Sequence, residues 1–223
     1  MDYKEVLAAD RNEMTAFLQT LLSLQSVKAE LQTGAPFGSG IRRTLDFVLS
    51  YAKRLGFDVY DADGYAGYAE IGDGDETLGI LVHLDVVPAG SGWKYKPFAG
   101  TVENGRIYGR GALDNKGPAT AALFALKSLM NTCSFKKKVR IIFGCDEESG
   151  WADMDYFTKK CGMPDIGFAP DAVFPVVYAE KGILHLNLST ELSEYHLGYY
   201  RLLSLTGGDR VNVIPDCARA ELI

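Results

Sequence analysis

The sequence predicts an α/β fold in which a mixed central sheet carries helices on both of its faces. Residues 78–85 form an apolar run that ends in His83 and Asp85, a pattern typical of a strand buried on both faces. Further along the chain, strand-like and helix-like segments alternate. From His185 the residues alternate strictly between polar and apolar, which predicts a second, half-exposed sheet with His185 in a strand.

The composition indicates a soluble globular protein. The chain has 223 residues, a formal net charge of −6 and a hydrophobic fraction of 47%. The acidic balance argues against a nucleic-acid partner, and no window approaches the roughly 18 apolar residues of a membrane span. The N-terminus lacks the apolar core of a signal peptide, and the four cysteines form no CxxC pair, so a reducing cytoplasm is the expected location.

The first half of the chain predicts two helices before the buried strand. Apolar spacing indicates a helix at residues 3–24, with a break near Asp10, and a second helix at 41–55 that Gly56 ends. The residues between Gly56 and the buried strand read as a β-hairpin with its turn at Asp63 and Gly64. Parallel and antiparallel strands are therefore expected in one sheet.

The segment after Asp85 predicts a long, functional loop over residues 86–118, rich in glycine, proline and aromatic side chains. Pro118 suits the first turn of the helix that follows. Beyond this helix we expect a strand at 139–146, a helix at 151–160 and a short apolar segment that contains Asp171. His196 is interpreted as a surface residue.

Metal-type ligands follow several of these apolar elements. They are His83 with Asp85, Asp114, Glu147 with Glu148, and Asp171. His83 and Asp85 point to the same side of an extended chain, an arrangement suited to an imidazole ligand that a carboxylate orients. Adjacent acids at a strand end repel one another and need a cation or a shared proton. Imidazole and carboxylate ligands without thiolates suit zinc, cobalt or manganese.

Four ordered segments resemble the motifs of a known family. The segments HLDVVPAGSGW, GRGALDNKGP, GCDEESGW and PDAVFPVVYAEKG are similar to those of the aminoacylase-like di-zinc metallopeptidase family, in the branch of bacterial peptidase V and the Xaa-His dipeptidases. HExxH, GxSxG and Walker motifs are absent from the sequence. The resemblance implies a peptidase of dipeptides, with a small peptide as its partner.

The resemblance also implies a role for each site residue. His83 and Asp171 would hold one zinc ion, Glu148 would hold the other, and Asp114 would bridge both. Glu147 matches the family's general base, and Asp85 matches the carboxylate that orients the imidazole ligand. A cis peptide bond is implied between Asp114 and Asn115.

Family members are about twice as long as this chain, and their catalytic domain resumes after a lid. The resemblance therefore implies a catalytic domain at residues 1–181 and the beginning of an α+β lid domain at 182–223. The last zinc ligand has no counterpart in the sequence, so the isolated chain is expected to be a poorly active N-terminal portion. Two other functions stay open: an N-acyl amino acid deacylase of the desuccinylase or deacetylase type, and a catalytically silent fragment that binds metal.

Overall fold

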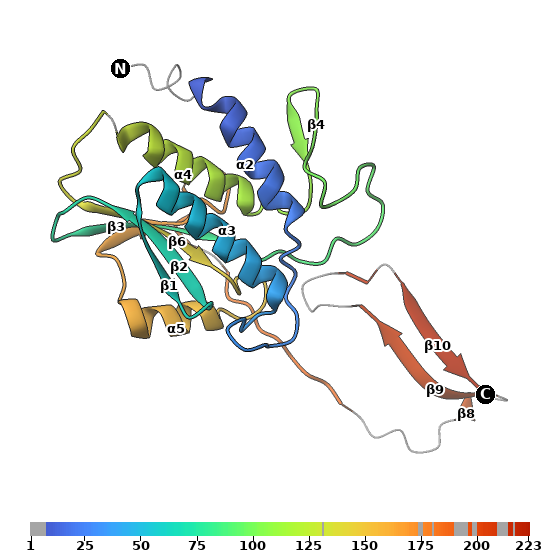
Figure 1. Ribbon diagram of the computed structural model, residues 1–223. Coiled ribbons are helices and arrows are strands. Elements are labelled where there is room, and N and C mark those ends of the chain that lie inside the picture. The colour runs from blue at the N-terminus through green and yellow to red at the C-terminus, as the bar shows by residue number, and fades with distance from the viewer. Residues whose placement is uncertain are drawn as a thin grey trace. The chain divides into compact units, whose positions relative to one another are not determined.

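A computed structural model gives the fold (Figure 1). It describes residues 8–130, 132–173, 176–179, 181–189, 196–197, 200–208, 214–215 and 217–223. The chain divides into two compact units, residues 1–174 and residues 175–223. The sequence-based domain boundary at residue 181 lies seven residues beyond this division and stays a prediction.

The first unit is built on a five-stranded mixed sheet with the strand order β1-β2-β6-β3-β7. Its strands are β1 (Asp58–Ala62), β2 (Ala66–Ile71), β3 (Thr77–His83), β6 (Lys138–Gly144) and β7 (Ile166–Phe168). Strand β3 pairs in parallel with both β6 and β7, whereas β2 runs antiparallel to β6 and to β1. This arrangement confirms the predicted mixed sheet. It also brings the carboxyl ends of β3, β6 and β7 to one edge, where ligands bind in open α/β sheets.

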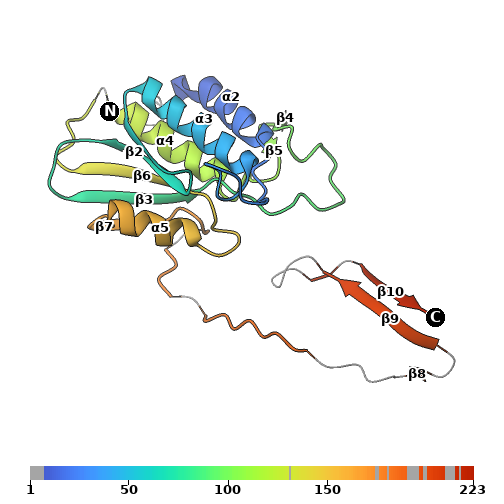
Figure 2. The same cartoon turned by 60° about the horizontal axis from the view of Figure 1, so that its bottom comes forward.

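Helices cover both faces of this sheet, as predicted (Figure 2). They are α2 (Arg11–Ser23), α3 (Ser39–Leu55), α4 (Lys116–Met130) and α5 (Ala152–Cys161). The helices α2, α3 and α4 share one apolar cluster with the sheet, in which Leu21, Leu45 and Leu123 are fully buried. On the opposite face, Phe157 of α5 packs in a separate cluster with Ile142 of β6.

The helix ends follow the sequence signals. A turn at Asp10 precedes α2, which confirms the predicted break; residues 3–7 of the predicted helix lie outside the described residues. Gly56 ends α3 in the left-handed conformation, with φ 98°, a conformation that glycine adopts without steric cost. Pro118 lies in the first turn of α4, also as predicted.

The segment at residues 86–118, predicted as a long loop, is not irregular throughout. It contains a small antiparallel hairpin of β4 (Thr101–Glu103) and β5 (Arg106–Tyr108). Asn104 and Gly105 make the turn, both with positive φ. An Asn-Gly turn between alternating residues is a hairpin signal, and three-residue strands are short enough to be overlooked in a glycine-rich segment.

The second unit contains a three-stranded antiparallel sheet in the order β10-β9-β8. Its strands are β8 (His196–Leu197), β9 (Tyr200–Gly207) and β10 (Ala218–Leu222). The prediction of a strand from His185 is wrong for residues 185–189, which have no strand; residue 190 lies outside the described part of the chain. An alternating pattern specifies a side-chain face, but a strand also needs a backbone partner, and the described residues supply none here. His196 does lie in a strand, and the exposure of its side chain is not among the described features. The helical component expected for this region stays a prediction.

Candidate metal centre

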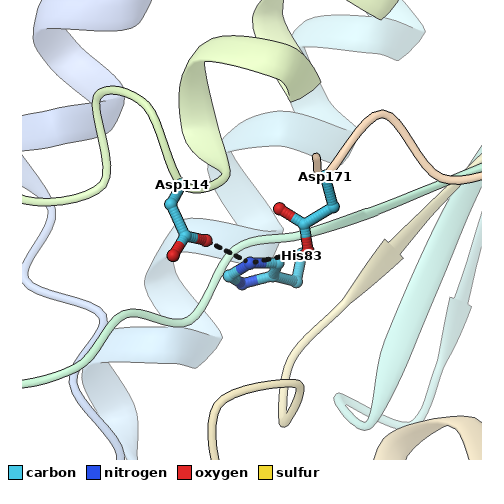
Figure 3. Close-up of side chains that lie close together, drawn as sticks. All are labelled: His83, Asp114 and Asp171. Atoms are coloured by element: carbon cyan, nitrogen blue, oxygen red, sulfur yellow. Dashed lines mark hydrogen bonds and ion pairs between the residues drawn. The ribbon is translucent and has the colours of Figure 1, made fainter. Parts of the chain in front are cut away.

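The predicted site residues converge at the shared carboxyl edge of the parallel strands. His83 is the last residue of β3, and Glu147 and Glu148 lie in the turn after β6. Asp171 follows β7 by three residues, and Asp114 lies just before α4. Figure 3 shows Asp114 and Asp171 approaching the His83 ring from different segments. The parallel register of β3 with β6 and β7 is what brings these distant residues together.

One nitrogen of the buried His83 ring faces three carboxylates. The Nε2 atom lies 2.8 Å from Asp114 Oδ1, 3.6 Å from Asp171 Oδ2 and 3.9 Å from Glu147 Oε2. The residue itself is only 3% exposed. A single proton on Nε2 can serve one of these oxygens well, whereas a divalent cation can contact several. The donor set therefore fits a metal ion.

Two groups of ligand atoms meet the geometric requirement for a metal site. In each group the ligand atoms lie within 4.8 Å of one another; the groups are His83 with Asp114 and Asp171, and His83 with Glu147 and Glu148. The first group coincides with the ligands expected for one metal. The expected second set combined Glu148 with Asp114, and these assignments remain proposals.

Asp85 holds the imidazole from its other side. His83 Nδ1 lies 3.0 Å from the backbone oxygen of Asp85 and 3.4 Å from its Oδ1 atom. With the proton on Nδ1 donated to Asp85, the lone pair of Nε2 is left to face the cluster. Asp85, 1% exposed, also accepts the backbone N–H groups of Glu147 at 3.2 Å and Glu148 at 3.1 Å.

The pKa values in the cluster reflect its crowding. Burial raises the pKa of Glu147 to about 7; the His83 charge opposes this shift and the Glu148 charge reinforces it. Burial also raises the pKa of Glu148 and of Asp171. Burial alone lowers the pKa of His83, but hydrogen bonds with Asp114 and Asp85 outweigh it and raise the value to about 11. Perturbed pKa values of this kind cluster at functional sites, and a bound cation would relieve the repulsion among these acids.

Asn115 is a site residue that sequence reasoning missed. Its side chain is fully buried, accepts the His83 backbone N–H at 3.3 Å and donates from Nδ2 to Asp171 Oδ1 at 2.6 Å. The peptide bond before it, Asp114–Asn115, is cis, as the resemblance implied. Asn115 thus connects three proposed ligands. In the GRGALDNKGP motif the sequence points to Asp114 as a metal ligand and not to Asn115. An amide that binds backbone groups follows no characteristic spacing in the sequence.

A pocket adjoins the cluster on the side of α5. Its lining combines apolar side chains with site residues: Leu81, Trp151, Met154, His83, Glu147 and Asp171. Trp151 has a positive φ of 60° immediately before α5, an uncommon backbone conformation for a bulky residue. The pocket therefore provides an apolar surface directly beside the candidate catalytic carboxylate.

Sequence comparisons identify relatives over the full length of this chain. It is 42% identical over 226 residues to a provisionally named dipeptidase of Staphylococcus epidermidis, covering 99% of this chain and 48% of the relative. It is 39% identical over 226 residues to YtjP of Bacillus subtilis, likewise provisionally named a dipeptidase. This match covers 100% of this chain and 49% of the relative. The chain thus spans about half the length of the curated relatives it matches.

Solved structures and a family model agree with these relatives. An M20 family metallo-carboxypeptidase from Sulfolobus solfataricus is 31% identical, with a TM-score of 0.60 over 70% of this chain and 37% of that one. Human carnosine dipeptidase 1 supports the fold. It is 23% identical, with a TM-score of 0.65 over 77% of this chain and 41% of that one. The sequence model of Peptidase family M20/M25/M40 matches residues 79–208, more than half of the chain, and confirms the resemblance of the four motifs. The chain belongs to Peptidase family M20/M25/M40.

Proposed function

We propose that this chain carries the metal site of a peptidase that hydrolyses the peptide bond of dipeptides. The observation that carries the proposal is the buried His83 Nε2 atom, which faces three carboxylate side chains within 3.9 Å at the carboxyl edge of a parallel sheet. Family membership and the dipeptidase names of the relatives support the reaction and the substrate class.

The donor chemistry favours zinc, with cobalt or manganese as substitutes, because the ligands are one imidazole and several carboxylates. His83 and Asp171 would hold one ion, Glu148 would hold a second, and Asp114 would bridge the two. When bound, the two ions would supply Lewis acidity, polarising the scissile carbonyl and acidifying a water molecule.

Glu147 is the proposed general base. Its carboxylate would take a proton from the attacking water and return it to the leaving amine. Burial raises the pKa of Glu147 to about 7 in the metal-free site, and bound divalent ions would lower that pKa, so the carboxylate would be ionised and able to accept the proton. Asp85 keeps the His83 ring in one orientation and binds the backbone of the turn that carries Glu147, so it acts on two ligand segments at once.

The adjoining pocket would contact the substrate. Leu81, Trp151 and Met154 offer it an apolar surface beside Glu147, which suits a side chain of a small peptide. None of the helices in the described residues is long and apolar enough to cross a membrane. A cytoplasmic location is proposed from the cysteine spacing of the sequence alone.

The test compares two adjacent acids in the natural protein. Glu147→Gln should lower turnover of dipeptides by about 10²- to 10⁴-fold while metal content stays near that of the unsubstituted protein, because a general base contributes to rate. Glu148→Gln should lower metal occupancy. Glu76→Gln, at an acid that pairs with Lys137 outside the cluster, is the matched control.

Dipeptide turnover by mass spectrometry and metal content by inductively coupled plasma spectrometry are the two readouts. Equal metal loss in both variants would show that the roles of the two acids are misassigned. Faster hydrolysis of N-acyl amino acids than of dipeptides by the unsubstituted protein would replace the dipeptidase with a deacylase.

A further inference from the structure

The turn that carries Glu147 and Glu148 is held at every one of its backbone N–H groups. These N–H groups belong to residues 145–152, which comprise the turn between β6 and α5 and the first residue of α5. Asp153 Oδ2 accepts the N–H groups of residues 145 and 146, and Asp85 accepts those of 147 and 148. The backbone oxygen of Asp146 accepts those of 149, 150 and 151, and its Oδ2 atom accepts that of 152. Three aspartates therefore fix the path of the turn.

All three of these aspartates are buried. Asp85, Asp146 and Asp153 are each 1% exposed. A buried carboxylate is costly unless charge or hydrogen bonds compensate it. Asp85 contacts the His83 ring, and Asp153 accepts backbone N–H groups only among the described residues. Asp146 has a cationic partner from a distant part of the chain: Lys28 Nζ lies 2.5 Å from its Oδ1 atom.

The backbone beside Lys28 is itself attached to the end of β3. Ser26 Oγ donates to the Leu84 oxygen at 2.6 Å, and the Val86 N–H donates to the Ser26 oxygen at 3.0 Å. Val27 and Val86 form a parallel bridge. The residues that present Lys28 thus flank Asp85, the other carboxylate that binds the turn.

We propose that the Lys28–Asp146 ion pair fixes the turn in the position that presents Glu147 and Glu148, which makes Lys28 a positioning residue. The inference rests on the proposed function for its catalytic consequence. Without the ammonium group, the Asp146 carboxylate is buried with less compensation, so it moves towards water. This movement displaces the residue that accepts four successive N–H groups, and small displacements of reacting groups are expensive in rate.

The experiment uses Lys28→Met, Lys28→Arg and Asp146→Asn in the natural protein. The matched control is Arg140→Met, which removes a different partly buried ion pair. Arg140 lies in β6, near the end of the strand opposite to the turn, and its guanidinium lies 2.6 Å from the Glu70 carboxylate. Lys28→Met should lower kcat by about 10- to 100-fold with KM nearly unchanged, the usual range for residues that orient a metal site. Lys28→Arg should restore most of the rate, and Arg140→Met should leave kcat unchanged.

A double-substitution cycle tests whether the two residues act as a pair. If they do, Lys28→Met combined with Asp146→Asn lowers kcat no further than either single change. Hydrogen exchange of residues 145–152 adds a readout that needs no activity: exchange should accelerate in Lys28→Met and stay unchanged in Arg140→Met.

The outcomes separate this inference from the proposed function. Additive losses, absence of rescue by Lys28→Arg, or unchanged exchange in the turn would each overturn the positioning role. An unsubstituted protein without metal-dependent hydrolysis would overturn the proposed function instead, and the exchange measurement would still decide whether Lys28 holds the turn.

Discussion

At the scale of single residues, the structure concentrates negative charge around one imidazole nitrogen. Proton and metal therefore compete for His83 Nε2. The pKa of about 11 means that His83 is protonated at neutral pH before a metal binds, and Glu147, with a pKa of about 7, is partly protonated. Binding of a divalent ion must displace at least the His83 proton.

This competition gives the first prediction. Zinc affinity should rise with pH between pH 6 and 9, by about tenfold per pH unit for each proton displaced, because the metal-free site binds protons that the metal-bound site lacks. Isothermal titration in buffers of different ionisation enthalpy measures the number of protons released. A proton count of zero across this range would contradict the arrangement around His83.

The second prediction concerns Asn115. Asn115→Ala removes the acceptor of the His83 backbone N–H and the donor to Asp171, so both ligands lose a fixed contact. Zinc affinity should fall by about 10- to 100-fold. Competition with a chromophoric chelator measures it, with Asn12→Ala on the exposed surface of α2 as the control. Equal affinities in the two variants would remove Asn115 from the site.

At the scale of secondary-structure elements, Lys116 links α4 to the end of α2. It is the largest fully buried side chain of the chain's described part, and its Nζ atom donates to the Leu21 oxygen at 2.9 Å and the Leu24 oxygen at 2.8 Å. Burial lowers the pKa of Lys116 to about 7 from 10.5. Between these values the unfolded chain binds a proton that the folded chain does not.

The third prediction follows from this difference in bound protons between the unfolded and the folded chain. The contribution of Lys116 to the free energy of unfolding should increase from pH 7 to pH 10.5, at up to about 1.4 kcal/mol per pH unit, and be constant below and above that range. Urea unfolding at pH 7, 8 and 9 compares the natural protein with Lys116→Met. The substituted protein should show a smaller rise in stability; parallel pH profiles would refute the assignment.

A fourth prediction tests a close approach of backbones. A Cβ atom on Gly40, in the first turn of α3, would lie 2.2 Å from the Gln25 oxygen, which belongs to the segment that leads to Lys28. Gly40→Ala should therefore destabilise the protein by roughly 1–3 kcal/mol, since backbone must move. Gly182→Ala, where nothing lies within 4 Å, is the control. Thermal unfolding measures the difference. Similar melting temperatures for Gly40→Ala and Gly182→Ala would argue against the close approach of Gly40 to Gln25.

The elements that the sequence predicted well are those with a local signal. Apolar periodicity and glycine or proline at the ends specify α3, α4 and the buried strand β3 without reference to the rest of the fold. The strand expected at His185 failed because pairing depends on a partner elsewhere in the chain. Asn115 and Lys28 were missed for the same physical reason: the contact of Lys28 with Asp146 spans 118 positions, and no spacing rule encodes it.

At the scale of the whole molecule, residues 176–179 and 181–189 of the second unit contain no helix or strand. Tyr178 is 96% exposed in this segment. We propose that the domain boundary lies here, close to the sequence-based position at residue 181. Limited digestion with chymotrypsin should cut first after Tyr178, because a protease needs an exposed segment without regular pairing. A first cut within residues 86–112 would contradict this boundary.

We propose a divalent metal centre in which His83 and Asp171 hold one ion, Glu148 holds a second and Asp114 bridges both. Anomalous diffraction at the zinc absorption edge, from crystals of the natural protein soaked in zinc, tests it most directly. The predicted result is anomalous density beside His83 Nε2, in contact with the carboxylates of Asp114 and Asp171. Full soaking without density at this position, or density only at other carboxylates, would contradict the metal site and the reaction proposed from it.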